Sequence, residues 1–393
     1  TVPTATTPLA DILVGRDRPG SAGVQANLTE QLDLTVRFST GPITHALVTG
    51  LEVARQTSDL DRYSNPFNAN NNWVPETSLL NPNPVEPLAG ILPVTSRQHT
   101  TARSESFYVT DRIGFNQYFD LLASARYDRF SADYAQLTVT SGAVLILSHV
   151  DNVGSPRVAF EYKPSAAQTY YIAYGTSFDP SAEALTLTPQ TANLGPVKAK
   201  SYETGAKESL LGGGLLVSAA VFRTEVNNAQ TNDPDNPTLT ILNGDQRVDG
   251  LELQANGHLT KNWELFAGYS LLDGKTLSSG TASYVGKAIP NVAHDTLNLW
   301  TEYSLPFGIE VGGGGNWVDQ RFADSGQMAR LPGYVVWNAM LSWKVSQHVA
   351  LQLNGLNLFN RYYFVAPYYT NPAENHVVPG AGRSATLSIN VSL

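Results

Sequence analysis

The chain has 393 residues, of which 42% are hydrophobic and only 15% are charged, whereas an ordinary soluble domain has about 25% charged residues. The formal net charge of −9 argues against a general nucleic-acid binder, and the lack of cysteine excludes a disulfide framework and a thiolate metal site. No run of about eighteen apolar residues exists, which excludes a helical membrane span.

Strand-like segments with alternating apolar and polar residues follow one another along nearly the whole chain. Residues 1–29 read as an irregular start or as the end of an earlier barrel strand, and about fifteen strands follow within residues 30–393. The last segment shows the period clearly, because Leu387, Ile389 and Val391 alternate with polar residues. Most segments run about ten to fifteen residues, long enough to cross a bilayer at a tilt.

The connections between these segments alternate between short and long. Such sorting is typical of a barrel that spans an outer membrane, with tight periplasmic turns and longer extracellular loops. Aromatic residues near segment ends, such as Trp263 and Tyr334, fit the girdles at the two membrane interfaces. We therefore predict an all-β, antiparallel, transmembrane outer-membrane barrel, although alternation alone also fits a soluble sandwich. Short connections are predicted at 40–43, 114–116, 164–167, 211–214, 259–262, 305–308 and 346–348, and seven long ones at 59–96, 131–154, 178–199, 227–244, 276–292, 322–332 and 360–382.

An ordered succession of motifs within roughly residues 155–393 resembles the TonB-dependent siderophore receptors, and the last motif resembles their catecholate-type branch. The motifs are Tyr171–Glu183, Ser201–Lys207, Gln246–Leu253, Asn357–Tyr363 and His376–Arg383. The resemblance implies a barrel of about twenty-two strands around an N-terminal plug domain. By this template the chain holds roughly the last fifteen strands, and the plug and the first strands are expected to be absent from it.

The resemblance also implies the ligand, a ferric siderophore of catecholate type whose iron is already coordinated, so that no cofactor or protein metal ligand is expected. Such a ligand is anionic and carries flat aromatic rings, which calls for arginine and aromatic side chains on the extracellular loops. Arg383 has a second interpretation, pairing with a carboxylate in the lumen. The candidate ligand-binding residues are Arg62, Tyr63, Trp73, Arg321, Phe322, Arg330, Tyr368, Tyr369 and Arg383.

The expected function is import of the ferric siderophore across the bacterial outer membrane by a monomer that contacts membrane lipid and, through the plug region, the TonB complex. No G-x-S-x-G, Walker or H-E-x-x-H motif occurs, so no enzyme is predicted. The alternatives are a passive general porin, a barrel used as a phage or colicin attachment surface, and an outer-membrane enzyme. The last should show a Ser-His constellation at the rim of the lumen, and none is visible in the sequence.

Overall fold

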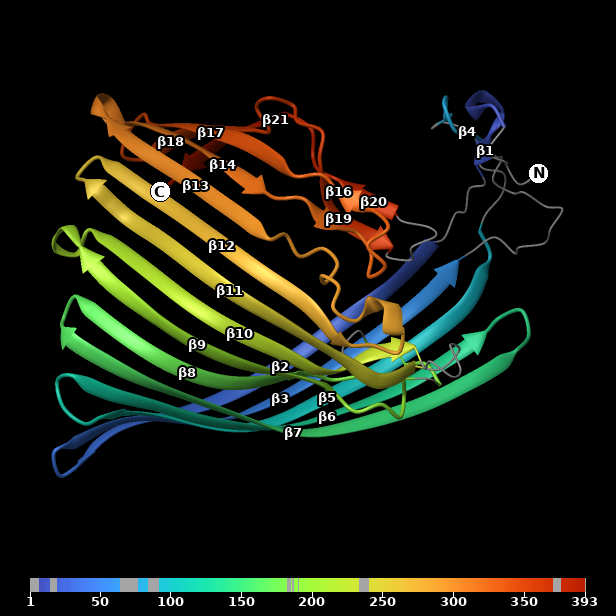
Figure 1. Cartoon of the computed structure of the whole chain (residues 1–393), viewed down its shortest axis with the longest axis horizontal. Coiled ribbons are helices and arrows are strands. Elements are labelled where there is room, and N and C mark those ends of the chain that lie inside the picture. The colour runs from blue at the N-terminus through green and yellow to red at the C-terminus, as the bar shows by residue number, and fades with distance from the viewer. Residues whose placement is uncertain are drawn as a thin grey trace.

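The computed structural model describes residues 7–14, 20–63, 77–83, 92–181, 185, 187–189, 191–232, 240–369 and 376–392. In these described ranges, fifteen strands form one antiparallel sheet in which each strand pairs with the next sheet strand along the chain (Figure 1). They are β2 (Gly20–Thr40), β3 (Ile43–Tyr63), β5 (Val94–Gly114), β6 (Phe119–Thr138), β7 (Ala143–Ser165), β8 (Gln168–Asp179), β9 (Val197–Leu210), β10 (Leu215–Asn232), β11 (Thr240–Thr260), β12 (Trp263–Ser278), β13 (Asp295–Leu305), β14 (Ile309–Val318), β17 (Tyr334–Lys344), β18 (Val349–Leu356) and β21 (Ser384–Val391).

Within the described part of the chain, three two-stranded sheets and four short 3-10 turns lie outside this sheet. The small sheets pair β1 with β4, β15 with β16, and β19 with β20, and the last two of these are hairpins. Among the described residues, no helix is long and apolar enough to cross a bilayer. The short elements are η1 (Leu9–Asp11), β1 (Leu13–Val14), β4 (Thr77–Ser78), η2 (Leu211–Gly213), η3 (Ala282–Tyr284), η4 (Pro306–Gly308), β15 (Arg321–Phe322), β16 (Arg330–Leu331), β19 (Phe364–Tyr369) and β20 (His376–Pro379).

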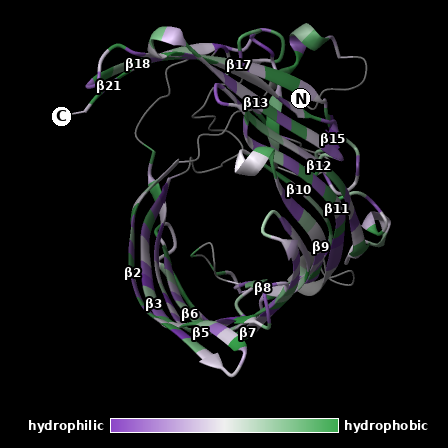
Figure 2. Cartoon of the chain, turned by 90° about the vertical axis from the view of Figure 1, so that its left-hand side faces the viewer, coloured by the Kyte–Doolittle hydropathy of each residue, from purple (hydrophilic) through white to green (hydrophobic). Residues whose placement is uncertain are grey.

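The large sheet curves about an axis, so that β2 and β3 lie across from β9–β12 (Figure 2). Its edges are β2 and β21, each of which pairs with one strand only in this sheet. The fifteen antiparallel strands confirm the predicted fold class. One boundary differs, because β2 begins at Gly20 and residues 20–29 are strand instead of an irregular start.

The seven predicted short connections all lie between consecutive strands at one end of the molecule (Figure 1). Several depend on left-handed backbone, which glycine adopts without steric cost. Gly41 has φ of 64° in the turn between β2 and β3, and Gly212 has φ of 67° between β9 and β10. These turns are tight because the chain has only a few residues in which to reverse direction.

Two predicted long loops are largely strand. Residues 131–154 were expected to form a loop, but β6 and β7 continue through them and leave only residues 139–142 as the connection. Likewise, β10 runs to Asn232 and β11 starts at Thr240. The strands β2, β3, β5, β6 and β7 have 20–23 residues, about twice the length that crosses a bilayer. Beyond the membrane both faces of a strand meet water, so the apolar alternation that identifies a strand disappears.

The two faces of the sheet differ in character. One row across β2, β3, β5 and β6 places Leu51 beside Phe107 and Tyr127, which are 54%, 50% and 52% exposed. The next row, on the opposite face, places Ser106 beside Asp128, and both are buried. Side chains converge on a concave face and diverge on a convex one, so the buried polar row lines the lumen and the exposed apolar row faces outward.

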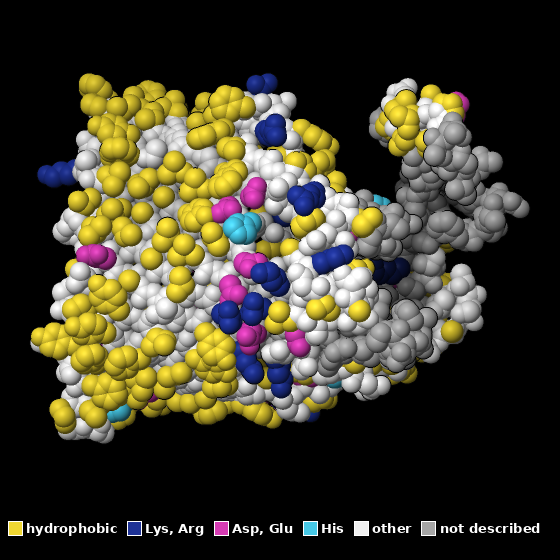
Figure 3. All heavy atoms as spheres, viewed as in Figure 1, with side chains coloured by type: hydrophobic (Ala, Val, Ile, Leu, Met, Phe, Trp, Pro, Cys, Tyr) yellow, Lys and Arg dark blue, Asp and Glu magenta, His cyan; other side chains and the backbone are white. Residues whose placement is uncertain are grey.

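Charged side chains on the outer face mark where the apolar band ends. Arg129 is the eleventh residue of β6, and Glu105 lies nine residues before the end of β5; the two are 3.5 Å apart. About nine to eleven residues is the length of a transmembrane β-strand, so this height corresponds to the outer membrane interface. Figure 3 shows the same division on another part of the wall, with hydrophobic side chains toward the short turns and a charged band across the middle.

Candidate functional site

The β15–β16 and β19–β20 hairpins, at the end of the molecule that carries the long connections, are held together by one arginine. Arg321 donates from Nε to Asn291 Oδ1 at 2.8 Å and from Nη2 to the carbonyl oxygens of Val365 at 2.8 Å and Phe364 at 3.2 Å. Its guanidinium also lies over the ring of Tyr334, 5.9 Å from the centroid. These contacts connect three segments that are far apart in the sequence.

Arg321 is only 5% exposed, and carbonyl oxygens and an aromatic face surround it. Burial lowers the pKa of this guanidinium, but arginine titrates so far above neutral pH that the group stays charged. A buried cation is costly unless hydrogen bonds compensate it. The structure therefore uses this candidate ligand-binding residue to hold the two hairpins together.

Asn357 fixes the base of the β19–β20 hairpin. It donates from Nδ2 to the carbonyl oxygens of Arg361 and Ala381, both at 2.9 Å, and its Oδ1 accepts the Arg361 amide at 2.7 Å. The next turn is anchored by Asn360 Oδ1, which accepts the backbone amide of Arg383 at 3.0 Å. The side chain of the candidate residue Arg383 is exposed. Backbone contacts therefore fix the position of Arg383 while its charge faces solvent.

The candidate residues Phe322 and Arg330 face each other across the β15–β16 pair. The guanidinium carbon of Arg330 lies 4.5 Å from the centre of the Phe322 ring, and Arg330 is exposed. A cation on an aromatic face is preorganised for a flat, anionic ligand, because the ring restrains the guanidinium while its N–H groups remain free to donate. This is the pair of predicted residues that the structure brings together in a form suited to ligand binding.

The candidate residues Arg62 and Tyr63 lie at the extracellular end of β3, on the part of the wall that extends beyond the membrane interface. On the lumen side of this extension, Tyr134 donates to Gln136 Oε1 at 2.6 Å, and Gln98 donates to the same oxygen at 3.1 Å. Burial raises the pKa of the Tyr134 hydroxyl, while the nearby positive charge of Arg62 opposes this shift. The wall here presents neutral hydrogen-bonding groups and one exposed cation.

Trp73 lies outside the residues that the structure describes. Tyr368 and Tyr369 are the last two residues of strand β19. The other six are described, and they fall on two parts of the mouth, which is the end of the barrel that carries the long connections. Arg62 and Tyr63 lie at the end of β3, and the rest lie on the connections that follow β14 and β18.

The sequence predicted the long connection between β8 and β9, at 178–199, but not its packing: the described residues of this connection pack on the lumen side of β5–β7. Thr100 Oγ1 donates to the Leu185 carbonyl oxygen at 2.6 Å, and His149 Nδ1 lies 2.7 Å from the Ala192 carbonyl oxygen. Leu187 is buried in a cluster with Tyr134 and two alanines, Ala102 and Ala132. The signal in the sequence was the small side chains at 100, 102 and 132, which leave room for a covering segment.

Comparison with known proteins is consistent with this architecture. The family model described as "TonB dependent receptor-like, beta-barrel" matches residues 4–358. The chain belongs to the TonB-dependent receptor family. This membership confirms the resemblance seen in the motifs and places the chain in the bacterial outer membrane, where these barrels reside.

Several members of this family align with nearly the whole chain. The probable TonB-dependent siderophore receptor PiuA of Acinetobacter baumannii is 30% identical over 92% of the chain and 52% of its own length, and the PiuA crystal structure has a TM-score of 0.84 over 94% of the chain and 56% of that structure. The probable TonB-dependent receptor BfrD of Bordetella pertussis is 28% identical over 98% of the chain and 55% of its own length. The catecholate siderophore receptor Fiu of Escherichia coli K12 is 26% identical over 93% of the chain and 50% of its own length. The chain thus spans about half the length of the curated relatives it matches.

Proposed function

We propose that this chain forms the barrel wall and mouth of a receptor that binds a ferric siderophore and imports it with TonB-derived energy. The observation that carries the proposal is the match with the A. baumannii siderophore receptor PiuA, which combines 30% sequence identity with a TM-score of 0.84 for its crystal structure. The polar lumen face and the cation-bearing mouth supply what such a ligand requires.

The proposed ligand is a catecholate siderophore, which is anionic and planar and carries its iron fully coordinated as cargo. Arg330 on Phe322 is the proposed contact, because an arginine restrained on a ring can stack on a catechol and donate to its oxygens. The Fiu receptor, whose printed name specifies a catecholate siderophore, supports this choice of ligand. No reaction on the ligand is proposed.

The proposal includes a monomeric barrel surrounded by outer-membrane lipid and a TonB complex that supplies energy. Family membership favours this assignment over a passive general porin, which would need no energy coupling. The alternatives of a phage or colicin attachment surface and of an outer-membrane enzyme have no residue arrangement in the described part of the mouth that favours them.

The test is ferric-siderophore binding by the purified natural protein that contains this chain, measured by quenching of tryptophan fluorescence. Arg330→Gln and Phe322→Ala should each weaken binding about ten-fold, within the range of a desolvated cation–π contact. Lys261→Gln is the control, because Lys261 is an exposed cation in a short turn at the opposite end of the barrel. Equal affinities for all four proteins would contradict the proposed site.

A further inference from the structure

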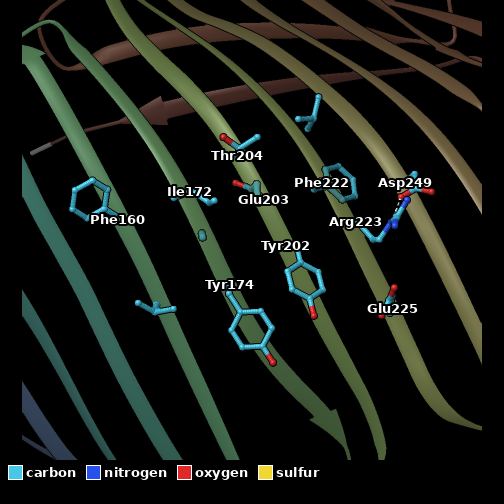
Figure 4. Close-up of a pocket in the computed structure, with 13 residues that line it drawn as sticks. Phe160, Ile172, Tyr174, Tyr202, Glu203, Thr204, Phe222, Arg223, Glu225 and Asp249 are labelled. Atoms are coloured by element: carbon cyan, nitrogen blue, oxygen red, sulfur yellow. Dashed lines mark hydrogen bonds and ion pairs between the residues drawn. The ribbon is translucent and has the colours of Figure 1, made fainter.

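Exposed apolar side chains on the outer face of the strands are explained by the lipid that the proposed barrel meets. The groove of about 840 Å³ over β7–β10 is an example (Figure 4). Phe160, Ile172 and Val221 along it are 40%, 63% and 49% exposed, and they lie close to the short turns, at a height that a bilayer covers. Met328 has no such explanation, because it is 75% exposed and lies in the turn of the β15–β16 hairpin, at the mouth.

The backbone at Met328 is held by a buried carboxylate. Asp324, which is 0% exposed, accepts the amide of Met328 at Oδ1 (3.1 Å) and the amide of Ala329 at Oδ2 (2.9 Å). The carbonyl oxygen of Asp324 accepts the Gln327 amide at 3.1 Å, and the Ala323 amide donates to the Ala329 carbonyl oxygen at 2.9 Å. These hydrogen bonds fix the course of the chain through the whole turn.

Two further features show that the turn is a built structure. Lys287, from the connection between β12 and β13, donates from Nζ to the Gly326 carbonyl oxygen at 2.8 Å and lies 5.8 Å from the centre of the Tyr284 ring. Gln327 has φ of 60°, a left-handed backbone that a residue other than glycine seldom adopts. Such strain persists only where the surroundings enforce it, and it is concentrated at functional sites. The turn therefore presents the Met328 side chain in a defined place.

Met328 shares one face of the hairpin with the proposed ligand contact. Side chains two residues apart in an extended segment point to the same side, and Met328 and Arg330 are both exposed. Arg330 pairs with Phe322, whose ring carries its guanidinium. The other face is buried, because Arg321 and Leu331 are only 5% and 3% exposed. The exposed face of the hairpin therefore combines a thioether, a guanidinium and an aromatic ring.

We infer that Met328 is a specificity-determining contact, whose thioether packs against a catechol ring while Arg330 donates hydrogen bonds to the catechol oxygens. The inference rests on the proposed function. Sulfur makes favourable contacts with aromatic rings, and an unbranched methionine side chain adapts to the ring that it meets. A chelate without a ring, such as a hydroxamate, can accept hydrogen bonds from Arg330 but cannot make the sulfur–aromatic contact. Met328 therefore favours aromatic chelates over aliphatic ones.

The first test is oxidation of the purified natural protein that contains this chain, with and without the redox-inert gallium(III) tris-catecholate complex. Hydrogen peroxide converts exposed methionine to its sulfoxide, and mass spectrometry measures the rate at each methionine. Saturation with the complex should slow the oxidation of Met328 about five-fold. Met340, toward the short-turn end of β17, is the internal reference and should react at an unchanged rate. Gallium(III) tris-acetohydroxamate, which has no ring, should protect Met328 less than the catecholate complex does.

The second test is affinity for the gallium(III) tris-catecholate complex, measured by titration calorimetry. Met328→Ser keeps the backbone amide that binds Asp324 and should weaken binding about five-fold, within the range of a sulfur–aromatic contact. The matched control is Leu211→Ser, because Leu211 is 61% exposed in a short turn at the opposite end of the barrel.

Three results would overturn the inference: equal oxidation of Met328 with and without the bound catecholate complex, equal protection by the two gallium complexes, or unchanged affinity in Met328→Ser. If Arg330→Gln still weakened binding in that case, the proposed function would stand without this contact. A wild type that binds no catecholate complex would overturn both the proposed function and the inference. Native proteolysis of the hairpin at the wild-type rate verifies that each variant keeps its fold.

Discussion

Arg321 was predicted from the sequence as a ligand contact, whereas in the structure its side chain holds two hairpins together. An arginine in a long connection of a receptor for an anionic ligand is a reasonable candidate for ligand contact. Its burial arises because β19, which comes some forty residues later, supplies two carbonyl oxygens to it. No local pattern encodes that contact. Arg330, only nine positions away in the same connection, remains exposed.

Arg321→Lys should therefore weaken the contact between the β15–β16 and β19–β20 hairpins while keeping the positive charge at this position. An ammonium is a compact donor group and does not reproduce the fork that reaches Asn291 and two carbonyl oxygens. We expect a loss of about 1–3 kcal/mol in local stability, seen as faster proteolysis of the hairpins under native conditions. Arg330→Lys is the matched control and should digest at the wild-type rate. Identical digestion of the two variants would show that Arg321 does not hold the hairpins together.

His294 gives a pH dependence whose sign follows from its partner. It lies just before β13, and its Nδ1 is 2.6 Å from Asp295 Oδ2. The hydrogen bond to Asp295 raises the pKa of His294, and the charges of Asp273 and Asp319 act in the same direction. A raised folded-state pKa gives a stabilisation that is fully present below the unfolded value of about 6.5 and is lost as the pH rises through the folded value.

The melting temperature of the wild type should exceed that of His294→Gln near pH 5.5, and the difference should vanish by about pH 9. The pair is more than half exposed on the histidine side, so solvent screening limits the effect to about one degree. His348→Gln is the control, because His348 lies in a short turn and its Nδ1 is near the carbonyl oxygen of Ser392. A difference that grows with pH would contradict the assignment.

At the scale of elements, the sequence correctly predicted the strands and short turns of the membrane-spanning part, but it did not predict the structure on the extracellular side of the membrane. Strand number and short turns were correct because the apolar alternation and the turn glycines are local signals. The hairpin of β6 and β7 was mistaken for a loop at 131–154, where residues such as Ser131, Asp133 and Asn152 face water and break the alternation. The β8–β9 connection was predicted at 178–199, but its packing on β5–β7 was not, since this packing depends on contacts between segments that are distant in the sequence.

The β8–β9 connection should behave as a separately opening unit. Leu187→Ala removes the apolar side chain that anchors it to Ala102, Ala132 and Tyr134. Hydrogen exchange at residues 191–194 should accelerate about ten-fold or more, because local opening needs less free energy once the buried contact is lost. Leu80→Ala, at an exposed leucine of another connection, should leave these amides unchanged. Unchanged exchange in Leu187→Ala would mean that hydrogen bonds alone hold the segment.

At the scale of the molecule, the barrel wall meets three environments: the membrane lipid, the wet lumen and the water beyond the membrane interface. Its first nine to eleven residues above the short turns present apolar side chains outward, and the next positions carry the charged band of the interface. At this height the concave face carries buried polar side chains such as Ser106 and Asp128, as expected of an outer-membrane barrel with a wet lumen. Beyond the interface, the extended hairpins and the β15–β16 and β19–β20 pairs form the mouth, where the ligand is proposed to bind.

The most direct test of the central claim is uptake of radiolabelled iron by cells that express the natural protein containing this chain, with and without a functional TonB system. The account predicts saturable accumulation of iron supplied as a ferric catecholate siderophore, complete dependence on TonB, and a lower apparent affinity for Arg330→Gln. Uptake that is independent of TonB, does not saturate and extends to unrelated small solutes would contradict it.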